Sequence, residues 1–498
     1  MKKKKELIII LGSLLVVVLS VSIAYFTTTI NSKNSHVSTS SAELKIVFTS
    51  GTGTIAGSEI EPGWSSGVNT FTVKNQSNGT YKYNIVIKDL INTFVTTGYL
   101  QYKITSTDGG YNMSDFKDVP KSETATDEVL AYSVEIAKGA THTYSVEFRY
   151  LNSTTVNQNE DMGKKLSGTL FIEEGTTEPI PFYNKLLADN PTIQTRSSFS
   201  AIFTTTNTGT LYKATESIAG STAKDVYYFA GDAKNNWVKF GGFYWRIIRT
   251  NHDGSIRLLY SGTSPNTTEG YIGTSTFNST KNNSMYVGYM YGTSGTQASN
   301  RTNENNSKIK TYIDKWYNTN LSSYTKYIST EAVYCNDREV GSGTYSATGS
   351  QFYYAAYTRL NPNNVPSYNC TNSKDAFSGS NSEAKLTYPI GLMTADEITY
   401  AGGYRFTNLT SPYAWYYLNS AGSSITGSTY WWWLLSPSYW NGSGAYSWAV
   451  SVSSYPGGLH YGYVNLSFGV RPVISINGDA LYSKGNGSPE NPYEIVYN

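Results

Sequence analysis

The sequence predicts a mostly β protein, with an antiparallel sandwich at the N-terminus and an α+β domain at the C-terminus. In "YKYNIVI", at residues 81–87, alternate side chains would share one face, which is the period of a half-buried strand. Turn-forming pairs such as Pro62-Gly63 and Gly109-Gly110 separate runs of this kind. Beyond residue 200, two helical patterns stand among further strand-like runs. A length of 498 residues allows two or three domains.

Residues 1–24 have the pattern of an export segment. Four lysines, Lys2 to Lys5, precede an apolar run that ends at Ala24, and the basic end of such a segment stays in the cytoplasm. The run is as long as a short membrane span, and the small residues at its end suit a signal peptidase. We expect either a signal peptide cleaved after Ala24 or a retained anchor in the cytoplasmic membrane, followed by a polar arm at 25–43. In both cases the protein is extracellular or lies on the cell surface.

Residues 44–174 are predicted to form the β-sandwich. Strand-like runs alternate there with turn residues, as in "ELKIVFT", "NTFTVKN", "EVLAYSVEI", "HTYSVEFRYL" and "LSGTLFIEE". One face of each strand in a sandwich meets the core and the other meets water, which explains the alternation. Residues 175–200 follow as a linker that contains a short helical piece from Phe182 to Ala188.

The N-terminal region resembles a known family of exported proteins. The segments "SIAYFTTTINS", "AELKI" and "IEPGWSSGVNTFTVKNQSNGTYKYNIVI" are similar to the camelysin/TasA-like proteins of Gram-positive bacteria. The resemblance covers roughly residues 20–175 and implies export and a β-sandwich. Members of that family are described as metallopeptidases or as fibre-forming proteins. The H-E-x-x-H pair of zinc peptidases is absent from this sequence, so we carry over only the export route and the sandwich.

Residues 201–498 combine strand patterns with two helices. Strands are expected at "DVYYFAG", "WVKFGGFYWRIIRT" and "SIRLLYSG", and in "SKIKTYIDKWYNTNL" apolar and aromatic residues recur at helical spacing. In "TADEITYAGG", Thr394 and Glu397 have the spacing of a capping box, and the following glycines can end a helix. The capping box favours a structural explanation of the acidic pair Asp396 and Glu397 over a catalytic one.

Cys335 and Cys370 are the only cysteines in the chain. An even number of cysteines in an exported domain favours a disulfide. Closing a loop of this length would stabilise the fold by roughly 3–4 kcal/mol in the chain-entropy model. Free thiols and a catalytic thiol are the alternatives. The catalytic alternative is disfavoured because no histidine adjoins either cysteine in the sequence.

The segment at 430–476 is exceptionally rich in tryptophan and tyrosine. Strand patterns flank two loops in it, "SYWNGSG" and "SSYPGGLHYGYVN". Glycine-rich turns cannot bury many rings, so we expect these side chains to face solvent or a ligand. Tyrosine suits recognition because it offers a large contact area, a polar tip and few rotatable bonds. The alternative is that the rings pack inside a β-rich fold.

The C-terminal region also resembles a surface domain common in gut Firmicutes. The pattern "W-L-x-S-P", "A-x-x-V" and "G-V-R-P", preceded by "C-N-D-R" and "T-A-D-E", occurs in this sequence. The resemblance spans about 200–498 and implies a C-type lectin-like fold of the formylglycine-generating-enzyme group. Variable lectin-like proteins of that group carry ligand residues just before the closing G-x-R-P. By this resemblance the binding face consists of Tyr439, Trp440, Asn441, Tyr455, His460, Tyr461 and Tyr463. Trp448 and Arg471 would be structural.

Composition and motifs disfavour several classes of function. Apart from Lys2 to Lys5 the chain is close to neutral and has no basic stripe, so nucleic acid is not an expected partner. The sequence contains no phosphate-binding loop, nucleophile elbow or C-x-x-C pair, and its four histidines are far apart. We expect no cofactor and no metal site, while a structural calcium held by carbonyls and carboxylates stays open. The formylglycine enzyme uses cysteines near its site, whereas both cysteines here precede the aromatic segment.

These observations favour a binding protein over an enzyme. We expect an exported adhesion protein that recognises an extracellular glycan or protein through the aromatic loops of its C-terminal domain. A fibre or matrix subunit that self-associates through the same residues is the first alternative. A cell-wall polysaccharide enzyme is the second, although no motif surrounds a pair of acids.

Overall fold

The computed structural model describes residues 44–48, 54–56, 60–76, 79–265, 270–405, 415–418, 431–451 and 457–497. The chain divides into two compact units, residues 1–178 and 179–498. The predicted export segment and polar arm lie outside the described residues. Within the described ranges, no helix is long and apolar enough to cross a membrane.

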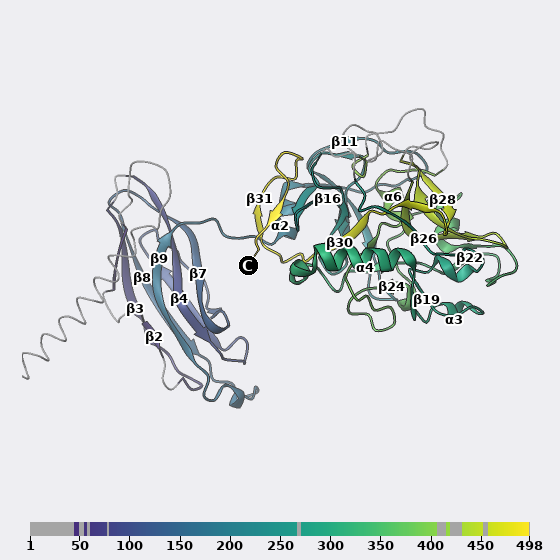
Figure 1. Ribbon diagram of the computed structural model, residues 1–498. Coiled ribbons are helices and arrows are strands. Elements are labelled where there is room, and N and C mark those ends of the chain that lie inside the picture. Colours follow the sequence, from purple (N-terminus) through teal and green to yellow (C-terminus); the bar gives the residue numbers. More distant parts are fainter. Residues whose placement is uncertain are drawn as a thin grey trace, which may run out of the picture. The chain divides into compact units, whose positions relative to one another are not determined.

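The first unit contains two antiparallel sheets, as its strand patterns predict (Figure 1). One sheet has the strand order β1-β3-β8-β5-β6 and the other has the order β2-β9-β4-β7. The strands are β1 Leu44–Phe48, β2 Thr54–Ala56, β3 Asn69–Asn75, β4 Tyr81–Asn92, β5 Leu100–Ser106, β6 Lys117–Asp118, β7 Ser122–Ile136, β8 Thr141–Tyr150 and β9 Leu166–Glu174. A 3-10 turn, η1 at Asn159–Asp161, precedes β9.

Alternating side chains build the core of this unit. Tyr83, Ile85 and Ile87, which the sequence places on one face of β4, are fully buried in one cluster. Asn84 lies on the other face of β4 and is also buried. Its side chain accepts hydrogen bonds from the backbone N–H groups of Ser133 and Thr176, which satisfy the polar group.

The second unit is built on two larger sheets. The first sheet has the order β10-β12-β13-β16-β17-β30-β25, with β15 paired to β16. Its strands are β10 Thr192–Gln194, β12 Thr210–Glu216, β13 Lys224–Tyr228, β15 Trp237–Phe240, β16 Phe243–Thr250, β17 Ile256–Tyr260, β25 Gly391–Leu392 and β30 Pro472–Ile476. The strand patterns predicted β13, β15, β16 and β17, and the structure confirms them.

The second sheet has the order β18-β29-β26-β23-β22, and β27 pairs with both β26 and β28. Its strands are β18 Thr274–Thr276, β22 Val340–Ser342, β23 Phe352–Tyr354, β26 Trp432–Trp440, β27 Ala445–Val450, β28 Leu459–Tyr463 and β29 Ser467–Gly469. Short pairs complete the unit: β11 Thr206–Asn207 with β14 Asp232–Ala233, β19 Met290–Tyr291 with β20 Asn305–Asn306, β21 Tyr334–Cys335 with β24 Ala376–Phe377, and β31 Tyr482–Lys484 with β32 Glu494–Ile495.

The helices of the second unit are short, apart from α4. They are α2 Phe182–Asp189, α3 Gln297–Asn300, α4 Lys308–Asn320, α5 Ala355–Leu360 and α6 Ala395–Tyr400, with 3-10 turns η2 Ser284–Val287, η3 Ser322–Tyr327 and η4 Ser373–Asp375. The two predicted helices are confirmed as α4 and α6. In α6 the predicted capping box forms, because Thr394 accepts from the backbone of Glu397 and Glu397 accepts from the backbone of Thr394.

The predicted linker at 175–200 is shorter in the structure. The second unit already begins at Pro179, and α2 belongs to it. Phe182 and Leu186 of α2 are fully buried in its main core, and β10 pairs with β12. Two apolar side chains one helical turn apart give this segment a face that packs against the core instead of staying in solvent.

Candidate binding site

Six half-buried tyrosines gather on the second sheet and on α5 beside it. We call them the tyrosine face: Tyr353, Tyr357, Tyr439, Tyr446, Tyr461 and Tyr463. Four come from neighbouring strands at one register. Tyr353 of β23 is opposite Tyr439 of β26, Tyr439 is opposite Tyr446 of β27, and Tyr446 is opposite Tyr463 of β28. Side chains at one register of a sheet share a face, so these four form a row across the strands.

The rings of this row contact one another. Tyr439 and Tyr446 stack with centroids 4.3 Å apart, and Tyr446 and Tyr463 stack at 4.0 Å. Tyr461 precedes Tyr463 by two residues and therefore shares its face. Its ring meets those of Tyr439 and Tyr446 at nearly right angles, at 4.9 and 5.5 Å. Because the stacked rings cover one another's faces, the row offers mainly ring edges and hydroxyls to a ligand.

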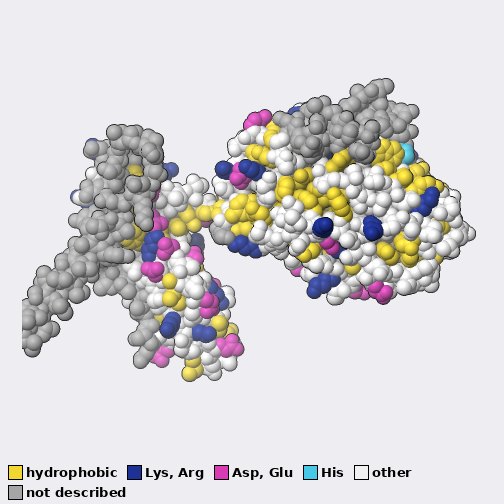
Figure 2. Space-filling view, viewed as in Figure 1, with side chains coloured by type: hydrophobic (Ala, Val, Ile, Leu, Met, Phe, Trp, Pro, Cys, Tyr) yellow, Lys and Arg dark blue, Asp and Glu magenta, His cyan; other side chains and the backbone are white. Residues whose placement is uncertain are grey.

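Helix α5 and a buried tryptophan complete the tyrosine face. Tyr357 of α5 lies 4.6 Å from Tyr353 and 5.7 Å from Tyr439, measured between ring centroids. Trp448 is fully buried, and its ring contacts those of Tyr357 and Tyr461 at 5.8 and 6.0 Å. Its burial agrees with the structural role that the resemblance implied. Figure 2 shows hydrophobic side chains, tyrosine included, gathered where β28 lies.

The phenol hydroxyls of Tyr439, Tyr446 and Tyr463 form a hydrogen-bonded chain that ends at Tyr463. Burial, together with the bond to Tyr463, raises the pKa of Tyr446 to about 12. The pKa of Tyr463 is lowered, first by the hydrogen bond with Tyr446 and then by Asn441 and Lys281. The ammonium nitrogen of Lys281 lies 3.3 Å from the centre of the Tyr463 ring. A cation therefore stands at one end of the row, over an aromatic ring.

The turn between β26 and β27 places Asn441 at the same end. Its Oδ1 accepts from the backbone N–H groups of Ser443 and Gly444, at 3.0 and 2.7 Å. Its Nδ2 donates to the hydroxyls of Tyr446 and Tyr463, at 3.4 and 3.3 Å. The turn thus fixes the side chain of Asn441 and adds an amide to the tyrosine face.

Four predicted binding residues are brought together, a fifth, His460, lies beside Tyr461, and a sixth, Trp440, is buried. Tyr439, Asn441, Tyr461 and Tyr463 lie on or beside the tyrosine face, and Tyr455 lies outside the described residues. The interpretation of Trp440 as an exposed ligand residue is wrong. Its side chain is 1% exposed, and its indole N–H donates to the carbonyl of Gly349 at 3.1 Å. Neighbouring side chains on a strand point to opposite faces, so Trp440 cannot share the face of Tyr439.

His460 lies at the edge of the tyrosine face, because its ring is 5.1 Å from that of Tyr461, measured between centroids. It directly precedes Tyr461 on β28, and its ring lies 4.5 Å from that of Trp431. Its Nδ1 accepts from the backbone N–H of Tyr461 at 2.8 Å. His460 therefore contacts both Trp431 and Tyr461 with its ring.

The sequence did not identify four members of the site: Tyr353, Tyr357, Tyr446 and Lys281. Tyr446 alternates with Trp448 in a strand pattern, so a face shared with Tyr439 could have been predicted from the hairpin. Tyr353 and Tyr357 join through pairing of β23 with β26, which is distant in sequence. No local sequence pattern identifies Lys281 as a member of the site. Its backbone carbonyl accepts from the N–H of Ala445 at 2.9 Å, and this bond holds it beside β27.

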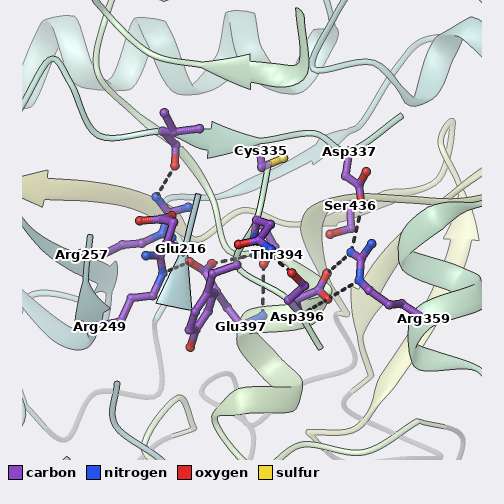
Figure 3. Close-up of a pocket in the computed structure, with 14 residues that line it drawn as sticks. Glu216, Arg249, Arg257, Cys335, Asp337, Arg359, Thr394, Asp396, Glu397 and Ser436 are labelled. Carbon is purple, nitrogen blue, oxygen red and sulfur yellow. Dashed lines mark hydrogen bonds and ion pairs between the residues drawn. The ribbon is translucent and has the colours of Figure 1, made fainter. Parts of the chain in front are cut away.

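A cluster of charged side chains lies in the same unit (Figure 3). We call it the ion-pair cluster, and it consists of Glu216, Asp337, Asp396, Glu397, Arg249, Arg257 and Arg359. Arg249 joins Glu216 and Glu397, with N–O distances of 2.8 and 3.0 Å. Arg257 also contacts Glu397, at 2.6 Å. Burial would raise the pKa of Glu216, but Arg249 and His252 lower it to about 2.

The other half of this cluster is centred on Arg359 of α5. Its guanidinium contacts Asp337 at 2.8 Å and binds both oxygens of Asp396, at 2.9 and 3.0 Å. Burial raises the pKa of Asp337 to about 6, although Arg359 opposes the shift. The cavity between these residues has a volume of about 20 Å³, enough for about one water molecule. Paired acids around so small a space favour a structural role for the cluster.

The predicted disulfide is confirmed between Cys335 and Cys370, and Cys335 borders this cavity. Arg471 is fully buried and donates to the backbone carbonyls of Tyr260 and Tyr417, as the structural role predicted for it requires. Among the described residues, no group of three or more His, Cys, Asp or Glu side chains is arranged to hold a metal ion. No family model, curated protein or solved structure matches the chain.

Proposed function

We propose that this protein is an exported binding protein that holds saccharides on the tyrosine face. The observation that carries the proposal is the row of half-buried tyrosines at one register of four neighbouring strands. Sugars combine hydroxyl groups with apolar C–H groups, and a tyrosine offers a hydroxyl and an apolar ring in one side chain. The row repeats this combination along the sheet.

The hydrogen-bonding groups of the face are held in place before a ligand arrives. A phenol hydroxyl has one donor and two acceptor positions, so each hydroxyl in the chain keeps capacity for a sugar hydroxyl. Stacked neighbours fix the rings of Tyr439, Tyr446 and Tyr463. Little conformational entropy is therefore lost on binding, which supports recognition by this surface.

The proposal includes export and a C-type lectin-like class for the second unit. The N-terminal pattern of lysines and apolar residues supports export. The disulfide Cys335–Cys370 supports it too, because disulfides persist in oxidising compartments. The β-rich second unit, with its closing "GVRP" segment, supports the lectin-like class.

The ion-pair cluster favours binding over hydrolysis. A polysaccharide hydrolase needs a pair of carboxyl groups on either side of a sugar bond. The four carboxylates of the cluster each pair with an arginine, and their cavity holds about one water molecule. A sugar ring has no room there, so the proposed activity is binding without turnover.

Binding of the full chain to a glycan array tests the proposal. We expect at least one saccharide to bind, and the double variant Tyr439→Ala/Tyr461→Ala to lose at least about tenfold in affinity, because two contact side chains are removed. Tyr132→Ala is the matched control, since Tyr132 is half-buried in the first unit, and it should bind like the wild type. Circular dichroism checks that both variants fold like the wild type.

Two outcomes would contradict the proposal. One is the absence of binding to every saccharide on the array. The other is a concentration-dependent oligomer that the double variant abolishes, as seen by gel filtration, because that would assign the tyrosine face to self-association. Binding to a protein array with no glycan binding would equally exclude a saccharide ligand.

A further inference from the structure

Lys281 is placed so that its charge can act on a ligand of the tyrosine face. Its backbone is fixed by the hydrogen bond from Ala445, and its ammonium lies over the ring of Tyr463. The same ammonium contacts the hydroxyl of Tyr463. It takes part in none of the ion pairs between described residues. An ammonium has three N–H donors, so it keeps donors for a further acceptor.

The segments that build the face contain no acidic residue. Residues 270–303 carry Lys281, residues 340–374 carry β23 and α5, and residues 398–478 carry β26, β27 and β28. None of these three ranges contains Asp or Glu. This includes the parts of those ranges that lie outside the described residues, so no carboxylate from them can neutralise the ammonium. In Figure 2, no acidic side chain is visible among the hydrophobic ones around β28.

A second cation lies towards the other end of the face. Arg405 is bridged to Leu459, two residues before Tyr461. It is close enough to Tyr357 for its charge to oppose the rise in pKa that burial of that phenol causes. The tyrosine face is therefore flanked by Lys281 and Arg405, and its surroundings favour negative charge. Neutral ligands gain nothing from this field, whereas anionic ligands do.

We infer that the ligand is an anionic saccharide whose acidic group pairs with Lys281 while its hydroxyls contact the tyrosine row. A carboxylate on a sugar ring fits best, because it stands within one sugar unit of hydroxyls that the phenols and Asn441 can bond. The inference rests on the proposed saccharide binding and adds the charge of the ligand. Charge-assisted hydrogen bonds are roughly twice as strong as neutral ones, so this contact dominates selectivity.

Oligogalacturonate and its fully methyl-esterified form give a matched pair of probes, because they differ in charge while they share the sugar backbone. We expect the full chain to bind the acid at least about tenfold more tightly than the ester, in line with the loss of one charged hydrogen bond. Lys281→Gln should remove this preference, and Lys281→Glu should reverse it. Lys308→Gln is the control, because Lys308 is exposed at the start of α4, and it should keep the preference.

The same glycan array separates this inference from the proposed function. Array hits confined to saccharides with carboxylate, sulfate or phosphate groups, weakened by salt and by Lys281→Gln, support the inference. Neutral saccharides that bind as tightly as acidic ones overturn it and leave the proposed function intact. An acid preference that survives Lys281→Gln and Lys281→Glu also overturns it. If no saccharide binds, both this inference and the proposed function are overturned.

Discussion

The tyrosine face and the ion-pair cluster lie in one unit and share α5, but they differ in how their polar groups are paired. In the ion-pair cluster every carboxylate has an arginine partner, and the central space holds about one water molecule. In the tyrosine face the rings are half-buried, the hydroxyls bond one another, and Lys281 has no carboxylate partner within the described residues. The charged groups of the ion-pair cluster bond one another, whereas the tyrosine face keeps hydrogen-bonding capacity for the proposed ligand.

This difference shows why convergence of acids alone does not identify a functional site. Four acids and three arginines meet in the ion-pair cluster, but each acid there already pairs with at least one arginine. Such a cluster holds β12, β16, β17 and two helices together, because each charge would be costly to bury without its partner. Tyrosines carry no charge, so they can remain half exposed at low cost, as a surface that binds the proposed ligand requires.

We expect the largest loss of folding stability for Arg249→Ala. The change leaves Glu216 with only His252 and Glu397 with only Arg257. Removal of one partner from a buried ion pair destabilises a protein by about 3–5 kcal/mol. Because Arg249→Ala removes a partner from two carboxylates, we expect a loss near the upper end of this range. Urea denaturation followed by circular dichroism measures the loss.

Lys213→Ala provides the contrast for this prediction. Lys213 pairs with Asp225 at the surface, and surface pairs of this kind contribute little. We expect its urea midpoint to match that of the wild type. If Arg249→Ala were as stable as Lys213→Ala, the ion-pair cluster would not be a structural element, and a catalytic role would need to be reconsidered.

Trp440→Ala should cause the next largest loss of folding stability, and Tyr439→Ala should cause a smaller loss. Trp440 is fully buried, so its truncation leaves a cavity and costs about 3–4 kcal/mol. Tyr439 is half-buried and should cost about 1–2 kcal/mol. Thermal unfolding of the two variants compares neighbouring residues on opposite faces of β26. Equal losses would contradict the assignment of Tyr439 to the ligand-binding side.

The same neighbours show how far the sequence could predict the structure. Period two in "YKYNIVI", helical spacing in α4 and the capping box of α6 are local patterns, and each formed the element it predicted. In the aromatic segment the pieces "SYWNGSG" and "SSYPGGLHYGYVN" were predicted as loops, but β26 extends into the first and β28 lies in the second. Once β26 forms, alternation places its neighbouring aromatic residues on two faces, so Trp440 separates from Tyr439. On β28, His460 keeps a ring contact with Tyr461.

The rest of the site depends on contacts between segments far apart in the sequence. Tyr353 joins the row only when β23 pairs with β26, and Lys281 joins only when its carbonyl bonds Ala445. No local pattern around these residues marks them. The charged partners of Glu397 could not be predicted either, because Arg249 and Arg257 come from β16 and β17, which are distant in the sequence. The capping box explained one role of this glutamate and left its ion pairs undetected.

Asp337 gives a pH-dependent effect on stability. In the folded chain its pKa is about 6, raised from 3.8 by burial, with Arg359 opposing the shift and Asp396 and Asp375 reinforcing it. The folded state therefore holds this proton more tightly than the unfolded chain. Its contribution to stability is complete below pH 3.8 and is lost as the pH rises to about 6. The loss amounts to about 3 kcal/mol.

Urea denaturation of the wild type and Asp337→Asn across this pH range measures the effect. Asparagine does not titrate, so the stability of the variant relative to the wild type should increase between pH 3.8 and 6 and stay constant above that. A constant difference at every pH would show that Asp337 does not carry a raised pKa. The comparison sharpens the contrast with the tyrosine face, where burial raises the pKa of Tyr446 to about 12.

The smallest effect concerns the ionisation of Tyr463. Its pKa lies below the ordinary value of 10, mainly because of the hydrogen bond with Tyr446, with further lowering by Asn441 and Lys281. The ultraviolet difference between the wild type and Tyr463→Phe isolates this phenol during an alkaline titration. Tyr446→Phe should raise the midpoint most, because it removes the largest cause, and Lys281→Gln should raise it less. If Lys281→Gln left the midpoint unchanged, the ammonium would not lie over Tyr463, and the tyrosine face would lose the cation that selects an anionic ligand.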